Sequence, residues 1–349
     1  MSPALALPQR RRLGTRAALA LLAALLAATL LAALATGPVA LSPARVFAVL
    51  MGDAAAPRDA AIVLTLRLPR TLLAAVVGAV LGAGGAVMQG LFRNPLADPG
   101  LLGVSAGGAM GAVTSIVFGA ALLPAALAPH AGAAAAFAGA LVVTLAVQRL
   151  ATVEGRVLVG AMLLAGIVFN ALAGAVTSAM IFAADDMQLR DILFWTMGSV
   201  AGANPRTLAI VAAASLPLLI AAPLLARALN ALILGEREAM TLGIAVETVK
   251  RLAVVLVALA VGASVAASGM VAFVGVIAPH LCRLARGADH GWVLPGSALI
   301  GAALLVAADT IARTVLAPAE LPIGLVTALL GGPFFLALLL RQRLAVDGT

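Results

Sequence analysis

Long apolar runs, separated by charged residues, proline and glycine, follow one another along almost the whole chain. Crossing the hydrocarbon core of a bilayer takes about 20 residues of α-helix, and ten runs come close to or exceed that length. They cover residues 17–41, 71–92, 100–119, 129–150, 157–183, 206–234, 251–268, 270–286, 292–316 and 322–341. The pattern predicts an all-α, polytopic membrane protein with about ten transmembrane helices, organised as a single transmembrane domain over residues 1–349.

Two of these runs need a closer look. Gly275 and Pro279 interrupt the eighth run, which is typical of a broken helix. The first run follows four arginines, Arg10, Arg11, Arg12 and Arg16, as in a secretory signal. Because it is as long as a full span and the chain stays hydrophobic after it, we expect a membrane helix rather than a cleaved leader.

Composition supports this interpretation. Of the 349 residues 63% are apolar and 10% charged, which excludes an ordinary soluble enzyme, a disordered chain and a nucleic-acid binder. The single cysteine, Cys282, excludes an intrachain disulfide scaffold.

The net charge of +8 has an explanation in membrane orientation. With both termini inside, 15 of the 22 Arg and Lys residues and seven of the 14 acids fall on the inner side, so the whole net charge lies there. The charge pattern therefore predicts an N-in, C-in topology, with residues 1–16 as a cytoplasmic tail.

Small residues recur every four positions in three spans. Gly78, Gly82, Ala86 and Gly90 form one stripe, and Gly103, Gly107 and Gly111 form a second; both are expected to serve helix packing inside one subunit. The third stripe, in the fifth span, is also polar and consists of Gly166, Asn170, Gly174 and Ser178, with Thr177 beside it. An amide is costly in lipid, so this face should either line a pathway or make an interhelical hydrogen bond.

The sequence lacks the motifs of nucleotide-binding, metal-binding and catalytic sites. There is no GxxxxGK[ST] loop, and the only lysine is Lys250, so ATP binding in the P-loop manner is excluded. The histidines His130, His280 and His290 lack metal-site spacing, and no catalytic constellation is present, so we expect neither a metal site nor an enzyme. Asp309 could serve an ion-coupled carrier, but Arg313 follows four residues later, which favours a structural ion pair.

Four stretches carry a family resemblance: RLPRT at 67–71, GAVMQGLFRNPLADPGLLGVSAGG at 85–108, VAFVGVIAPHLCRL at 271–284 and AELPIGLVTALLGGPFFLALLLR at 319–341. In this order and spacing they resemble the FecCD permeases, the membrane subunits of ATP-driven bacterial importers for ferric siderophores, cobalamin and haem. The stretch at 184–203 is most similar to haem permeases. A ferric-siderophore or cobalamin permease is the alternative within the family; an ion-coupled secondary carrier and a membrane scaffold are alternatives of other classes.

The resemblance implies a multi-pass permease domain of the bacterial inner membrane and a set of partners. These are a second copy of the chain, two cytoplasmic ABC ATPase subunits, a periplasmic binding protein that delivers haem, and membrane lipid. This chain would bind no cofactor and no nucleic acid, since the ATPase uses the ATP and Mg²⁺. The translocation path would follow the dimer axis, with the stripe of the fifth helix in its wall.

The resemblance also implies roles for single residues. Arg67, Arg70 and Arg313 would dock the binding protein on the outer face, although interfacial anchoring also suits the first two. Asn94 and Leu96, in the NPLADPG turn, would narrow a cytoplasmic gate, although a tight helix-to-helix turn explains its composition equally well. The loop 235–250 would couple to the ATPase through a short helix that a glycine could cap. Its contact candidates are Glu236, Arg237, Glu238, Ala239, Leu242 and Gly243.

Overall fold

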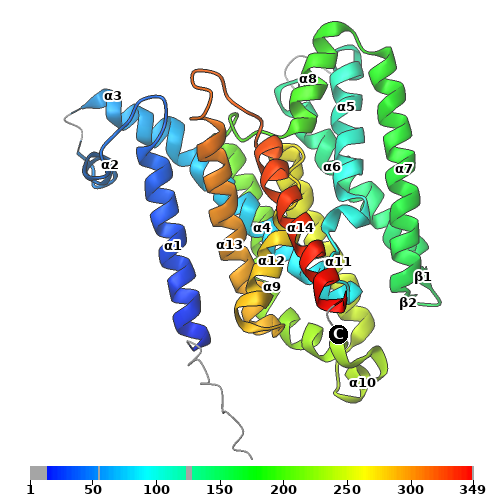
Figure 1. Cartoon of the computed structure of the whole chain (residues 1–349). Helices are drawn as coiled ribbons and strands as arrows, with labels where there is room; N and C mark the ends of the chain where they lie inside the picture. The colour runs from blue at the N-terminus through cyan, green and yellow to red at the C-terminus, as the bar shows by residue number, and fades with distance from the viewer. Residues whose placement is uncertain (1–13, 54–55, 123–127, 348–349) are drawn as a thin grey trace, which may run out of the picture.

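A computed structural model of the chain describes residues 14–53, 56–122 and 128–347 (Figure 1). The described residues are mainly helical, and their only strands are β1 (Thr152–Val153) and β2 (Arg156–Val157), which form a short antiparallel hairpin. The long helices are α1 (Thr15–Ala35), α4 (Leu68–Phe92), α5 (Val104–Leu122), α6 (Ala128–Leu150), α7 (Val159–Ala183), α9 (Pro205–Leu234), α11 (Val246–Ser268), α13 (His290–Ala312) and α14 (Ile323–Asp347). The shorter ones are α2 (Pro43–Leu50), α3 (Pro57–Ala60), α8 (Asp186–Met197), α10 (Glu236–Thr241) and α12 (Val274–Arg286), with a π-helix η1 (Ala61–Arg67) and a 3-10 helix η2 (Pro99–Leu102).

A helix occupies each of the ten predicted ranges, so the all-α, multi-pass fold is confirmed. Within the described residues seven helical segments are long and apolar enough to cross a membrane, while the apolar parts of α5 and α14 are shorter. The start of α1 and the end of α14 lie on the side of the molecule where α10 lies (Figure 1). This placement is consistent with an even number of crossings; ten crossings and their orientation stay predictions.

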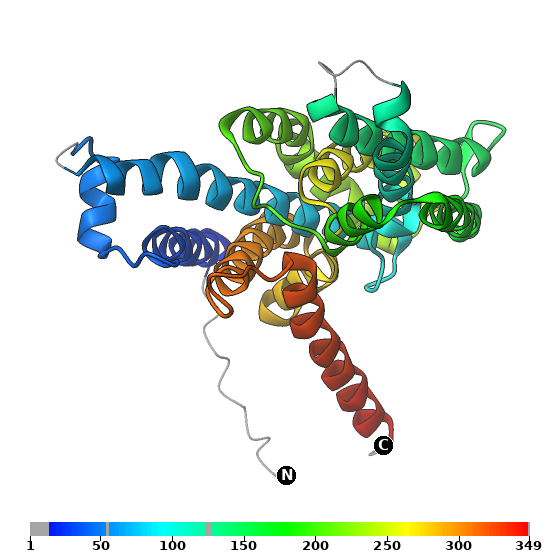
Figure 2. The same cartoon turned by 90° about the horizontal axis from the view of Figure 1, so that it is seen from above.

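Helix α4 runs through the centre of the molecule and packs against α13, α9, α12, α11 and α1 (Figure 2). A Cβ on Gly78 would collide with the carbonyl oxygen of Gly301, and a Cβ on Gly82 with that of Ser297, so α4 and α13 touch through their backbones. In the same way Gly107 of α5 lies against Gly139 of α6. The two glycine stripes therefore pack inside one subunit, as predicted.

The eighth apolar run is broken, but not at Gly275 or Pro279, the two residues that the sequence suggested; both lie inside α12. Helix α11 ends at Ser268, and residues 269–273 form no helix. Gly269 and Phe273 both have positive φ angles, 66° and 67°, which interrupt the helical path. Pro279 lies inside α12, a helix of only 13 residues that starts after this break. Proline is thus tolerated in the short helix, and the break comes before it.

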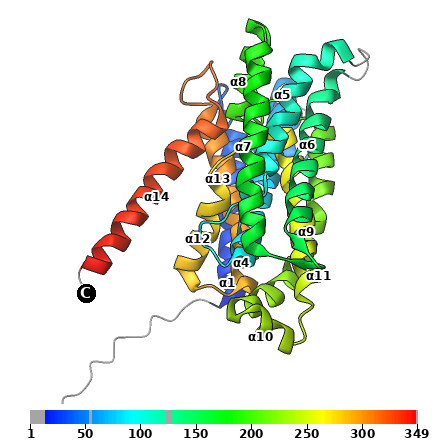
Figure 3. The ribbon, with the colours of Figure 1, turned by 90° about the vertical axis from the view of Figure 1, so that its right-hand side faces the viewer.

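The C-terminal helix is attached through its first half. Figure 3 shows α14 slanting away from the other helices. Its first half packs against α13, α12 and the end of α8, and Gly324 touches the carbonyls of Met197 and of Met270 in the non-helical segment before α12. Further along the helix, Phe334 and Phe335 still contact His280 and Phe273, with ring centroids 5.7 Å apart in each pair.

Candidate functional site

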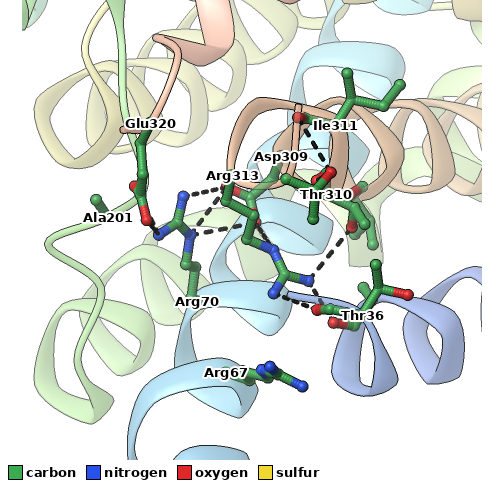
Figure 4. Close-up of polar contacts among 12 residues, drawn as sticks. Thr36, Arg67, Arg70, Ala201, Asp309, Thr310, Ile311, Arg313 and Glu320 are labelled. Carbon is green, nitrogen blue, oxygen red and sulfur yellow. Dashed lines mark hydrogen bonds and ion pairs between the residues drawn. The ribbon is translucent and has the colours of Figure 1, made fainter. Parts of the chain in front are cut away.

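Three arginines and two acids meet where α1 and α13 end and α4 begins, on the side opposite α10 (Figure 4). We call Arg67, Arg70, Arg313, Asp309 and Glu320 the outer arginine cluster. They come from the end of η1, the start of α4, the end of α13 and the α13–α14 loop. The RLPR motif and the last turns of α13 therefore form one polar site.

Arg70 is the main partner of both acids. Its Nη2 lies 2.8 Å from Asp309 Oδ1, its Nε donates to the same carboxylate at 3.0 Å, and its Nη1 donates to Glu320 Oε1 at 2.9 Å. The expected pair between Asp309 and Arg313 exists, but its Nε–Oδ2 distance is longer, 3.5 Å. Asp309 is therefore an ion-pair partner, chiefly of Arg70 rather than of the neighbour on its own helix.

Arg67 and Arg313 bind the end of α1. Arg313 donates to the carbonyls of Thr36, at 2.6 Å, and of Ala33. Arg67 donates to the carbonyls of Leu34, at 2.7 Å, and Ala35, at 3.2 Å, and also to that of Val39. The last carbonyls of a helix have no intrahelical donor and carry a partial negative charge, so cations stabilise them. Both arginines thus cap α1.

Arg67 is the last residue of the π-helix η1. It ends at Arg67, two residues before Pro69, which has no N–H and whose ring would clash with the carbonyl of residue i−4 in a regular α-helix. The wider π register accommodates the proline, and such turns occur often at functional positions.

Docking a binding protein would require these arginines to be accessible, and in this conformation they are largely buried. Arg67 is 6% exposed and Arg313 is 4% exposed, and Arg70 is largely buried beneath Glu320. Glu320, which is 42% exposed, is the accessible member of the cluster. Arg67 and Arg313 therefore offer almost no surface to a partner in this conformation, and docking by any of the three stays a prediction.

The polar stripe of α7 divides into two halves. In the inner half, Gly166 touches the carbonyl of Leu101, and Asn170 Nδ2 donates to the carbonyl of Gly100 at 3.1 Å. Of the two roles that the sequence left open, Asn170 therefore has the hydrogen bond to another element, the 3-10 helix η2. In the outer half Gly174 and Ser178 are exposed, and Thr177 bonds to its own helix at Ala173.

A cavity of about 500 Å³ lies next to η2, where several helices begin or end. Its wall contains the starts of η2, α5 and α14, the end of α8 and the non-helical residues before α12. The lining residues are Asp98, Gly100, Ser105, Thr196, Met197, Met270, Val271, Ala272, Phe273, Val276, Gly324 and Leu325. None of the predicted stripe residues is among them, but Asn170 holds Gly100 and so fixes part of the wall.

The turn that carries Asn94 and Leu96 is tightly ordered. Asn94 Oδ1 accepts the N–H of Leu96 at 3.0 Å, and Arg93 before it has a positive φ of 49°. This arrangement is an Asx turn, as expected for a tight helix-to-helix connection. Leu96 projects an exposed side chain, so its role as a gate residue stays a prediction.

The predicted coupling loop contains the helix that its sequence suggested. Gly243, with φ +80°, donates to the carbonyl of Met240, and Ile244 donates to that of Ala239, which together form a Schellman cap. The next helix, α11, begins at Val246, so the second part of the range 235–250 is helical rather than a loop.

The contact candidates on α10 and in its cap differ in accessibility. Arg237, Glu238, Leu242 and Gly243 are exposed, whereas Ala239 is fully buried in the chain's own core and offers no surface to a partner. Glu236 is half-buried, and its Oε2 lies 2.7 Å from Lys250 Nζ. Exposure thus leaves four of the six candidates free for a partner; coupling itself stays a prediction.

Three residues of these sites were not among the candidates, although the sequence marks each of them. Glu320 is the one acid in the otherwise uncharged stretch at 315–330, and Lys250 is the only lysine. Asp98 is the single acid of its turn, and its carboxylate caps η2 by accepting the N–H of Gly100 at 2.7 Å. Within the described residues no group of three His, Cys, Asp or Glu side chains could hold a metal ion.

Comparison with known proteins adds three findings. A model of the FecCD transport family matches residues 25–341. The hemin transport system permease protein HmuU of Yersinia pestis is 49% identical over 282 residues, which cover 80% of this chain and 83% of the relative. The cobalamin import system permease protein BtuC of Halobacterium salinarum is 44% identical over 286 residues, which cover 81% and 74%.

A solved structure is similar over nearly the whole length. It is described as an inward-facing conformation of a metal-chelate type ABC transporter, and it matches with a TM-score of 0.76 and 32% identity. The match covers 94% of this chain and all of the other chain.

Proposed function

Because the chain belongs to the FecCD transport family and is the permease subunit of an ABC importer, we propose that its cargo is haem. The observation that carries this proposal is the 49% identity to a hemin transport permease, against 44% to a cobalamin permease over a similar length. The chain would move haem from a periplasmic binding protein to the cytoplasm, by alternating access across the inner membrane.

The cavity next to η2 suits such a cargo. Its lining is apolar apart from a few side chains, among them Asp98, Ser105 and Thr196, and includes the thioethers of Met197 and Met270. No His, Cys or Tyr occurs among these lining residues. A passage without these strong iron ligands would let an iron porphyrin leave again, which transport requires.

The proposed complex contains two copies of this chain, two ATPases and a binding protein. The ATPases, which use ATP and Mg²⁺, would contact the exposed face of α10 with Arg237, Glu238 and Leu242. The binding protein would approach the outer arginine cluster, where Arg70 and Glu320 lie nearest the surface. Asn94 and Leu96 would narrow the inner end of the path, and Gly174, Thr177 and Ser178 would face it between the two copies.

The decisive experiment is uptake into sealed vesicles that contain the permease with its cognate ATPase and binding protein. We expect ATP-dependent accumulation of haem, and much less of cobalamin or a ferric siderophore. Preferential uptake of cobalamin would instead support the second candidate, which the identity to the BtuC proteins favours.

A gradient-driven carrier makes a different prediction: uptake without any ATPase. The contacts of Asp309 argue against it, since this carboxylate is paired with Arg70 at 2.8 Å and also contacts Arg313. These two ion pairs suit a structural role for the carboxylate.

A further inference from the structure

Lys250 joins three segments of the chain through one buried ammonium. Its side chain is 2% exposed. Its Nζ lies 2.7 Å from Glu236 Oε2 on α10 and 3.2 Å from Glu247 Oε1 on α11, and it donates to the carbonyl of Val157 on β2 at 2.9 Å. A lysine has three N–H donors, so these three acceptors use its full capacity.

Two neighbouring side chains hold the hairpin to α11 without reaching α10. Glu247 Oε2 accepts the N–H of Val157 at 2.6 Å, and the guanidinium of Arg251 donates to the carbonyl of Gly155. Of these three charged side chains on the first turns of α11, only Lys250 contacts both the hairpin and α10. Among these side chains, the ammonium of Lys250 is therefore what connects the hairpin to α10.

The hairpin in turn leads directly into α7. Val157 ends β2, and α7 begins two residues later at Val159. Leu158 donates to the carbonyl of Ala151, and Met162, in the first turn of α7, is fully buried. A displacement of β2 therefore reaches the start of α7, a helix whose outer half has a large exposed face.

We infer that Lys250 is a positioning residue for energy coupling, which ties the movement of α10 to the hairpin and so to α7. The inference rests on the proposed function, in which α10 contacts the ATPase. Neither end depends on Lys250 for its own attachment: α10 packs against α9 through the buried Ala239, and Glu247 and Arg251 hold the hairpin. Loss of the lysine should disconnect the two ends and leave both folded.

The first test measures haem imported per ATP hydrolysed, in vesicles with the ATPase and the binding protein. Lys250→Met keeps the apolar stem and removes the ammonium, and we expect the ratio to fall about fivefold or more. Lys250→Arg should restore most of it. Arg251→Met, which removes a hairpin contact but no link to α10, should leave the ratio near that of the wild type.

An unchanged ratio in Lys250→Met, or an equal fall in Arg251→Met, would overturn the inference. If Lys250→Met fails to assemble, Glu236→Gln removes the charge of the α10 partner alone and should lower the ratio in the same direction; an unchanged ratio there would also contradict the link.

A second measurement does not depend on the cargo. Spin labels at Val153→Cys and Met240→Cys, in a Cys282→Ala background, report the distance between the hairpin and α10; both labelled positions are exposed. We expect a narrow distance distribution in the wild type and in Arg251→Met, and a broad one in Lys250→Met. If the wild type imports no haem, the proposed function is wrong. The spin-label distances then still test whether Lys250 links the hairpin to α10.

Discussion

Buried cations connect helices at both ends of the molecule: Arg67, Arg70 and Arg313 at the outer end and Lys250 at the inner end. The two groups differ in which charge is in excess. In the outer arginine cluster three guanidiniums meet two carboxylates, and carbonyls of α1 satisfy the surplus donors. At the inner end one ammonium meets Glu236 and Glu247, which leaves a surplus of negative charge at half-buried positions. The difference shows that surplus positive charge can be buried against a helix end, whereas a surplus carboxylate stays near water.

The same comparison bears on partners. A surplus of positive charge on the outer side suits an acidic partner. Around α10 the charges balance, with Glu236, Glu238 and Glu247 against Arg237, Lys250 and Arg251, so charge favours neither sign of partner there. The outer cluster should therefore respond to mutation chiefly in stability, because most of it is buried. The inner cluster should respond chiefly in coupling.

The largest effect is expected for Asp309→Asn. The change leaves Arg70 and Arg313 without their buried counter-charge, which typically costs about 3–5 kcal/mol. Thermal unfolding of the purified permease in detergent measures it. Glu320→Gln, which alters the exposed acid on the same arginine, is the matched control and should cost about 1 kcal/mol or less. Equal losses in the two variants would contradict the ranking by burial.

Arg67→Met should come next. It removes the donors to Leu34, Ala35 and Val39, and unsatisfied buried carbonyls cost about 1–3 kcal/mol. Hydrogen exchange should become faster at the amides of Thr36 and Leu41, which bond to the end of α1. If their protection is unchanged while binding-protein docking is lost, Arg67 is a docking residue rather than a cap.

At the inner end, Glu236→Ala and Glu238→Ala separate partner contact from internal pairing. Glu238→Ala should weaken binding of the ATPase about two- to fivefold without altering stability, since an exposed ion pair contributes about 1 kcal/mol at most. Glu236→Ala should also lower the unfolding temperature, because it removes a partner of Lys250. Affinity measured by titration of the ATPase, together with thermal unfolding, distinguishes the two. Unchanged affinity in both variants would remove the interface assignment.

The smallest effect concerns docking on the outer side. Glu320→Gln removes the accessible acid that pairs with Arg70, and we expect the binding protein to associate about twofold faster at low salt. Stopped-flow association at several ionic strengths measures the rate. A slower rate would indicate that Glu320 itself contacts the partner.

Local patterns in the sequence predicted the helices and their packing well. Length and hydropathy located a helix in each of ten ranges, and the four-residue spacing of Gly78 and Gly82 indicated a close contact inside the subunit, which the backbone of α13 provides. The glycine at 243 also indicated correctly where the short helix α10 ends. These features depend on neighbours in the sequence, so one chain suffices to find them.

The polar contacts were predicted less well because their partners are distant in the sequence. Helical spacing paired Asp309 with Arg313, but Arg70, 239 residues away, makes the shorter contact. Arg67 looked like a surface charge because nothing local reveals that the end of α1 lies beside it. The cavity has the same origin: Asp98, Met270 and Gly324 come from three distant segments that only the fold brings together.

The backbone contact between Gly78 and Gly301 sets a limit on how this permease can change shape. Where a glycine of one helix touches a backbone carbonyl of the other, the two helices have no gap in which to slide or rotate. We therefore expect α4 and α13 to move as one rigid unit. Any opening and closing during a transport cycle must then come from movements of other elements relative to this pair, such as the outer half of α7, whose exposed face has no such backbone contact at Gly174.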